Sequence, residues 1–162
     1  MELIKGLSTA STAKKDALVI LNAIDEYVSE DKTILDIGSG DGSFLNILDE
    51  NINVKNLIGV EIQKQLHEKA LSNYPNLELH NENIINKLDI VEKSDIIFIN
   101  NSGFANYTFW EIWDSIKPGA VVVYNNISLS IKLKNSLDHS ISDIRLNNAI
   151  PFKEYHYIIK KS

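Results

Sequence analysis

The 162-residue chain has no cysteine, only 3 prolines and no long run of apolar residues. The lack of cysteine excludes disulfide bonds, thiolate zinc sites and cysteine nucleophiles. Because no stretch of about 18 or more apolar residues occurs and the amino terminus lacks the apolar run of a signal peptide, we expect no membrane span and a cytoplasmic or nuclear location. The four histidines are scattered without HxxxH or HxH spacing, so we expect no metal site.

The composition is that of a soluble globular protein, with 44% hydrophobic and 23% charged residues. A chain of this length can bury one core but is too short for two ordinary domains. We therefore expect a single domain over residues 1–162, with a core of 16–162 and an amino-terminal segment of 1–15. The net charge of -6 disfavours nucleic acid as a partner and tolerates a basic one.

Helix-like and strand-like segments alternate along the chain, which predicts an α/β fold with a parallel sheet covered by helices on both faces. Strands are expected at 33–37, 57–62, 77–80, 95–100 and 120–124. Helices are expected at 16–28, 43–49, 63–72 and 107–116. Two further strands, 143–146 and 155–160, are separated by a loop that contains proline and are expected to form a carboxyl-terminal antiparallel hairpin.

A glycine-rich turn, Asp36-Ile37-Gly38-Ser39-Gly40-Asp41-Gly42, follows the first expected strand and opens a helix. Glycine permits positive φ angles and lets a ligand approach the backbone closely. The GxGxG spacing differs from the GxGxxG of dinucleotide-binding proteins, in which a pyrophosphate rests on the helix N-terminus. The Asp36 carboxylate would repel a pyrophosphate and suits the ammonium end of a cationic ligand.

A second carboxylate, Glu61, ends the next expected strand, where an acidic side chain can accept hydrogen bonds from both ribose hydroxyls. The alternative is that the glycines only make a tight connection and that Glu61 is a solvated charge. Strand, glycine turn, helix, strand and terminal carboxylate occur in the order that favours a nucleoside site.

From about Asp16 to Lys160 the chain resembles a class I S-adenosylmethionine-dependent methyltransferase. The resemblance implies a Rossmann-like, seven-stranded sheet, with S-adenosyl-L-methionine as cofactor and S-adenosyl-L-homocysteine as product. It assigns Glu61 to the ribose, Ile62 and Ile84 to the two sides of the adenine, and Asn83 to its amine, although Asn81 and Glu82 are equally polar neighbours. The remaining cofactor residues that it implies are Asp36, Gly38, Ser39, Gly40, Gly42 and Asn100.

The fourth expected strand ends in Asn100-Asn101-Ser102-Gly103-Phe104, at the carboxyl edge of the sheet, where ligands of open α/β folds bind. An asparagine carbonyl can accept a hydrogen bond from an amine nucleophile, and Phe104 or Tyr107 can stack against a cation. The alternative is that Asn100 and Asn101 cap the following helix.

The segment DIIFINNSGFANYTFWEIWDSIKPGAVVVYNN is similar to the corresponding part of the non-SET, disruptor of telomeric silencing-like histone lysine methyltransferases. This similarity implies that Asn100 contacts the reacting end of the cofactor or substrate, and that Asn101 and Phe104 shape a lysine channel. Gly6 to Ser11 occupies the place of that family's substrate-gating loop.

These resemblances imply methyl transfer to an amine, and they favour a lysine of a lysine-rich protein substrate as the acceptor. The chain lacks the subgroup's long amino-terminal helical portion and basic tail, which argues against nucleosomal histone. Methyl transfer to RNA or a small molecule remains open, as does a non-catalytic cofactor-binding module with Trp110 and Trp113 at a partner surface.

Overall fold

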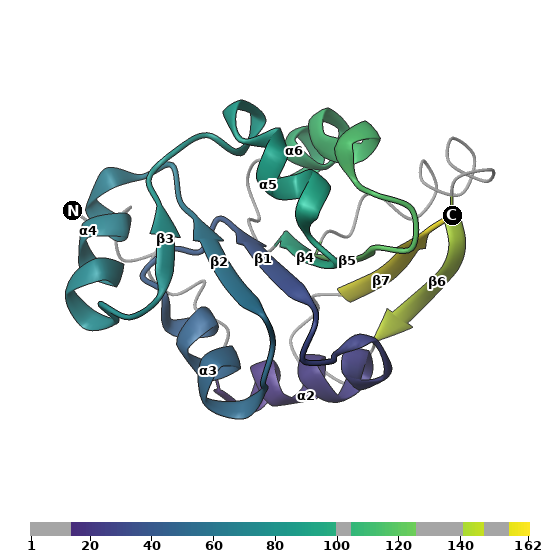
Figure 1. Cartoon of the computed structure of the whole chain (residues 1–162), viewed down its shortest axis with the longest axis horizontal. Helices are drawn as coiled ribbons and strands as arrows, with labels where there is room; N and C mark the ends of the chain where they lie inside the picture. Colours follow the sequence, from purple (N-terminus) through teal and green to yellow (C-terminus); the bar gives the residue numbers. More distant parts are fainter. Residues whose placement is uncertain (1–13, 100–104, 126–140, 148–155) are drawn as a thin grey trace.

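The computed structural model describes residues 14–99, 105–125, 141–147 and 156–162, and these form one sheet covered by helices on both faces (Figure 1). None of the helices in these ranges is long and apolar enough to cross a bilayer. The elements, in which η marks a 3-10 helix, are α2 (Lys14–Ile24), η1 (Asp25–Tyr27), β1 (Thr33–Ile37), α3 (Ser43–Asn51), β2 (Asn56–Val60), α4 (Lys64–Asn73), β3 (Glu78–His80), η2 (Ile84–Asn86), α5 (Leu88–Lys93), β4 (Ile96–Ile99), α6 (Ala105–Ile112), η3 (Trp113–Ser115), β5 (Val121–Asn125), β6 (Ile141–Asn147) and β7 (His156–Lys161).

The sheet has seven strands in the order β3-β2-β1-β4-β5-β7-β6, which confirms the expected fold class. The first five strands run parallel, and β7 pairs antiparallel with both β5 and β6. The strand order reverses between β1 and β4. Connections therefore leave these two neighbours in opposite directions, and a crevice opens at their carboxyl ends, where open α/β sheets bind ligands.

Alternating side chains on the strands bury two separate cores. On β1, Ile34 packs with α2 and α3, whereas Leu35 and Ile37 face the layer of α5, α6 and η3. The same alternation holds on β4, where Ile96 and Phe98 share the face of Ile34. Parallel strands buried on both sides lack the polar alternation of a half-exposed strand, which explains their continuous apolar sequences.

The helices differ from the sequence-based expectation at several points: the expected helix 16–28 is divided into α2 and η1, and η2 was not expected. Helix α5 was not expected, because its six residues make fewer than two turns and show too little periodicity. The expected helix 107–116 is divided into α6 and η3, and its two tryptophans have different environments. Trp113 is buried and stacks on Phe109, whereas Trp110 is 38% exposed.

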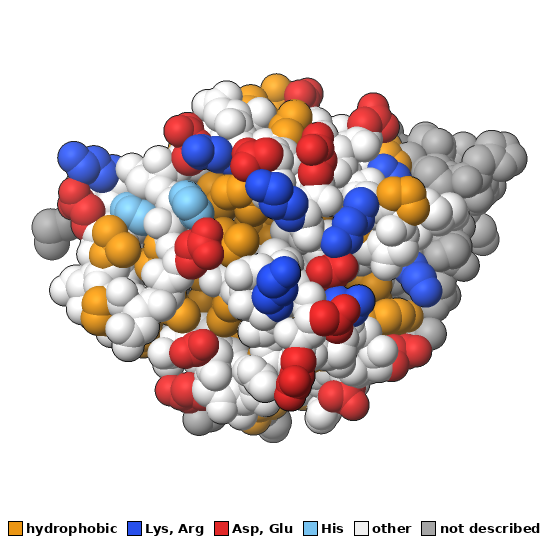
Figure 2. Space-filling view, in the orientation of Figure 1, with side chains coloured by type: hydrophobic (Ala, Val, Ile, Leu, Met, Phe, Trp, Pro, Cys, Tyr) orange, Lys and Arg blue, Asp and Glu red, His pale blue; other side chains and the backbone are white. Residues whose placement is uncertain are grey.

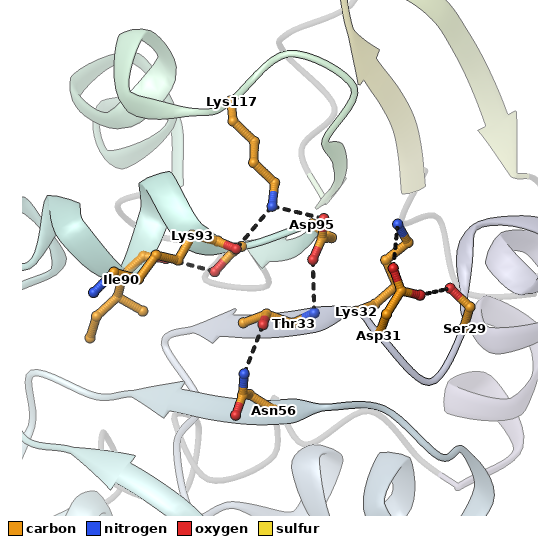
Figure 3. Close-up of polar contacts among 10 residues, drawn as sticks. Ser29, Asp31, Lys32, Thr33, Asn56, Ile90, Lys93, Asp95 and Lys117 are labelled. Atoms are coloured by element: carbon orange, nitrogen blue, oxygen red, sulfur yellow. Dashed lines mark hydrogen bonds and ion pairs between the residues drawn. The ribbon is translucent and has the colours of Figure 1, made fainter.

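At the amino-terminal edge of the sheet, Asp95 connects three strands (Figure 3). One carboxylate oxygen accepts the Thr33 amide of β1 at 2.9 Å, and the other lies 2.8 Å from the Lys117 ammonium, which precedes β5. Figure 3 shows Lys117 and Thr33 approaching Asp95 from opposite sides.

On the face shown in Figure 2, lysine side chains and acidic side chains are interspersed, and no large area carries charge of one sign only.

Replacing Asp95 by Ala is expected to lower the free energy of unfolding by about 2 kcal/mol at pH 7, because the Thr33 amide and Lys117 lose a shared acceptor. Burial by itself would raise the pKa of Asp95, but hydrogen bonds from Lys117 and Thr33 outweigh it and lower the pKa. The contribution is therefore present at neutral pH and lost as the pH falls below about 4.

Urea denaturation at pH 7 and pH 3 measures this effect. Asp89→Ala is the matched control, because it removes an exposed ion pair with Lys93 and should cost no more than about 0.5 kcal/mol. Equal destabilisation by the two substitutions would contradict a special role for Asp95.

Candidate functional site

The glycine-rich turn leaves β1 and folds back over the end of β2. The backbone amides of Gly38 and Ser39 donate to the Val60 carbonyl at 2.8 and 3.2 Å. Gly40 has φ +58, and among the described residues an added Cβ would meet nothing closer than the Gly38 carbonyl oxygen at 4.0 Å. The described neighbours therefore leave space for a Cβ at Gly40, and it is the positive φ that favours glycine there.

Gly42 needs glycine for an additional reason. It has φ +79, and a Cβ there would lie 3.0 Å from the Tyr74 ring and 3.2 Å from Ala70 at the end of α4. Its carbonyl accepts the Asn46 amide at 2.9 Å and so begins α3. The close approach of α4 gives Gly42 a packing role in the structure.

Glu61, directly after β2, is only 4% exposed, and its carboxylate closes the glycine turn. One oxygen accepts the backbone amide of Gly40 at 2.9 Å, and the other accepts that of Gln63 at 2.7 Å. The alternative of a solvated strand-end charge is therefore wrong. Each carboxylate oxygen can accept two hydrogen bonds, so capacity remains for ligand hydroxyls.

The second carboxylate, Asp36, is 1% exposed, and its Oδ1 has no hydrogen-bond partner among the residues that the structure describes. Burial, followed by the negative charge of Glu61, raises the pKa of Asp36 to about 7. A buried polar atom without a partner is costly. The pair of carboxylates therefore favours a cationic or hydrogen-bond-donating ligand.

A cavity of about 250 Å³ opens at the carboxyl ends of β1, β2 and β4. Four of the expected cofactor residues line it, namely Gly38, Ile62, Asn83 and Ile84. The other lining residues are Ile37, Val60, Glu82, Ile85, Ile99, Tyr107 and Thr108. A cavity with apolar walls and a few polar groups at its rim fits a planar heterocycle such as adenine.

The polar residues after β3 have different roles. Asn81 donates to the carbonyls of Glu61 and Ile62 at 2.7 and 3.2 Å, so it fixes the end of β2 rather than lining the cavity. Asn83 lines the cavity and caps η2 by accepting the Ile85 amide at 3.3 Å. The backbone N–H of Asn83 donates a hydrogen bond to the Glu82 carboxylate and lowers the pKa of that group. Glu82 lines the same cavity.

The structure thus brings together cofactor residues from three separate segments of the chain, the turn after β1, the loop after β2 and the loop after β3. Asp36, Ser39, Gly40, Gly42 and Glu61 build the turn beside the cavity. The expected catalytic residues Asn100, Asn101 and Phe104 lie outside the described residues, as does the expected gating segment Gly6 to Ser11. Their roles stay predictions.

Sequence reasoning missed the contribution of α6 to the cavity wall. Tyr107 and Thr108 line the cavity from the first turn of α6. Tyr107 was considered only as a stacking residue for a substrate cation. The sequence signal that could have placed Tyr107 at the cavity is its position shortly after the end of β4. The segment that follows a central parallel strand returns over the carboxyl edge of the sheet. Among the described residues, no cluster of three or more histidine, aspartate or glutamate side chains is arranged to hold a metal ion.

Comparison with known families agrees with this geometry. The model of the FtsJ-like methyltransferases matches residues 17–152, which include the glycine turn, Glu61 and the cavity. The chain belongs to the FtsJ-like methyltransferase family. Its fold is that of S-adenosylmethionine-dependent enzymes, and S-adenosyl-L-methionine is the cofactor of this FtsJ-like domain.

Relatives of the FtsJ-like domain include a ribosomal protein L11 methyltransferase of Clostridium perfringens, 28% identical over 103 residues, which are 62% of this chain and 33% of that protein. The chain thus spans about a third of the length of this curated relative. A SAM-dependent methyltransferase from Archaeoglobus fulgidus has the same fold, with a TM-score of 0.65, 16% identity and coverage of 92% of this chain and 95% of the other. An RNA methyltransferase from Salinibacter ruber, solved with S-adenosyl-L-homocysteine, has a TM-score of 0.66, 17% identity and coverage of 92% of each chain.

Replacing Asp36 by Asn is expected to stabilise the ligand-free domain at alkaline pH. Because the folded pKa of about 7 lies above the ordinary value of 3.8, the native state holds this proton more tightly than the unfolded chain does. The stabilising contribution is complete below about pH 4 and is lost as the pH rises through 7. Asn carries no such proton, so the variant should be more stable at pH 9 by on the order of 2–4 kcal/mol.

Thermal or urea denaturation between pH 5 and pH 9 measures the difference between the two proteins. The advantage of the variant should grow with pH. An advantage that stays constant over this range would show that Asp36 does not titrate as a buried acid.

Proposed function

We propose that this domain transfers a methyl group from S-adenosyl-L-methionine to the amine of a lysine side chain in a protein substrate. The observation that supports the choice of cofactor is the buried Asp36 carboxylate at the turn that Glu61 closes, whose Oδ1 has no partner in the described part of the chain. An apolar cavity for a heterocycle lies at the switch point of the sheet and is lined by Ile37 and Ile62, the residues that follow these two carboxylates in the chain.

The residues of the site fit the separate parts of the cofactor. Glu61 offers its remaining acceptor capacity to ribose hydroxyls, and the walls of Ile62 and Ile84 bury the adenine. Asp36 provides negative charge for the cationic end. When bound, the cofactor supplies an electrophilic methyl group, so the protein needs mainly to hold a neutral amine in line with it. Asn100 is our candidate for orienting the lone pair of that amine.

Three observations support a protein acceptor. The segment from Asp95 to Asn126 is similar to the non-SET lysine methyltransferases, and the net charge of -6 suits a basic protein better than a polyphosphate. A relative that is 28% identical carries the name of a methyltransferase for a ribosomal protein.

Replacing Glu61 by Ala should weaken binding of S-adenosyl-L-homocysteine by about tenfold or more, because a charge-assisted acceptor for the ribose is lost and the amide of Gly40 is released. Isothermal titration calorimetry measures the change, and circular dichroism checks the fold. Glu78→Ala, an exposed carboxylate on the neighbouring strand, is the control and should bind as the wild type does. Wild-type affinity in the Glu61 variant would remove this residue from the site.

Incubating the purified protein with cell lysate and methyl-labelled S-adenosyl-L-methionine should label protein bands. Protease should abolish the labelled product, nuclease should leave it intact, and acid hydrolysis should release methyl-lysine. Label that is sensitive to nuclease would refute a protein acceptor in favour of RNA. Cofactor binding without any transfer would favour a non-catalytic module.

A further inference from the structure

The outer side of α6 and η3 carries two exposed aromatic rings and two exposed carboxylates. Tyr107 is 60% exposed and Trp110 is 38% exposed, and Glu111 and Asp114 are exposed as well. Spacings of three, four and seven residues place these four side chains on one side of a helix. We call this surface the α6 face.

The opposite side of the same helix fixes the orientation of the α6 face. Phe109, Ile112 and Trp113 are buried against the sheet, with exposed fractions of 0%, 0% and 5%. Phe109 packs against Tyr124 of β5 and against Trp113, so the helix cannot rotate to bury Tyr107 or Trp110 without emptying the core. In Figure 1, α6 belongs to the upper helical layer.

The carboxylates of the α6 face are available to a partner. In the described part of the chain, neither Glu111 nor Asp114 makes an ion pair. The charge of Asp114 acts on Lys161, but the Lys161 ammonium is held at 2.7 and 2.6 Å by the carbonyls of Trp113 and Ile116. Two carboxylates beside two aromatic faces offer both ion pairing and cation–π contact to a basic side chain.

The α6 face is continuous with the cofactor site, because Tyr107 belongs to both. Tyr107 lines the cavity of about 250 Å³, and Trp110 and Glu111 follow one turn further along the helix. A chain segment that lies along the α6 face therefore ends at the cavity in which the cofactor is expected. This placement suits a substrate that must reach the methyl donor.

We propose that the α6 face docks a lysine- or arginine-rich segment of the protein substrate. The proposal deepens the proposed function and rests on it for the identity of the occupant as a substrate. The aromatic rings receive the aliphatic stems and cationic heads of basic side chains, and Glu111 and Asp114 pair with neighbouring cations. The same carboxylates repel phosphates, so the α6 face disfavours single-stranded RNA.

The test measures fluorescence anisotropy of a labelled peptide of alternating lysine and glycine at ~0.15 M salt. The double substitution Glu111→Lys/Asp114→Lys should weaken binding by at least about tenfold. Asp25→Lys/Asp49→Lys is the matched control, because it makes the same change in net charge at exposed sites on the opposite helical layer. The control should lose less than about twofold, since distant surface charges are screened.

A second pair of variants tests the aromatic contribution. Trp110→Ala should weaken peptide binding by about threefold or more, and Trp110→Phe should retain most of it because the π face remains. Equal loss in the two charge-reversal proteins would overturn the proposal, because it would show general attraction to an acidic protein. Absence of peptide binding by the wild type, or tighter binding of an oligouridylate at the same salt concentration, would overturn it as well.

Calorimetry with S-adenosyl-L-homocysteine separates this proposal from the proposed function. Glu111 and Asp114 do not line the cavity, so their charge reversal should leave cofactor-product affinity unchanged. A wild-type protein that binds the peptide but not S-adenosyl-L-homocysteine would refute the proposed function and leave the α6 face as a binding surface. Binding of S-adenosyl-L-homocysteine without the peptide would refute the α6 proposal alone.

Discussion

The hydrogen bonds that Glu61 accepts from the backbone of Gly40 and Gln63 hold the functional edge of this domain together. A buried carboxylate is stable only when donors surround it, and here the donors are main-chain amides. The glycine turn must therefore bend over the end of β2 to supply one of them. This requirement explains why the turn needs a positive φ at Gly40, where an added Cβ would otherwise find space.

The electrostatic character of the site follows from that arrangement. Glu61 has partners for both oxygens, whereas no donor of the described residues reaches Asp36 Oδ1. Two neighbouring buried carboxylates without a cation favour protonation of one of them, and a cationic ligand relieves the same repulsion. Burying these two carboxylates lowers the free energy of unfolding of the ligand-free domain. Binding sites commonly keep such destabilising groups because the ligand needs them.

Stability and function are placed at opposite edges of the sheet. At the amino-terminal edge, Asp95 links β1 and β4 to the turn before β5 through hydrogen bonds that satisfy both of its oxygens. At the carboxyl edge, polar groups remain available beside an apolar cavity. The α6 helix joins the two roles, because its inner side completes a core and its outer side presents aromatic and acidic side chains next to the cavity.

The sequence alone determined the sheet, its antiparallel last pair and the glycine turn, because these depend on local periodicity and on glycine at fixed spacing. It also located Glu61, because the order of strand, glycine turn, helix and strand places a carboxylate at the end of the second strand beside the glycine turn. Only the tertiary structure showed that Gly42 is required by the approach of α4, that Asn81 fixes β2 while Asn83 lines the cavity, and that Tyr107 reaches it from α6. These roles arise from contacts between segments distant in the chain, and no local pattern encodes which segments will meet.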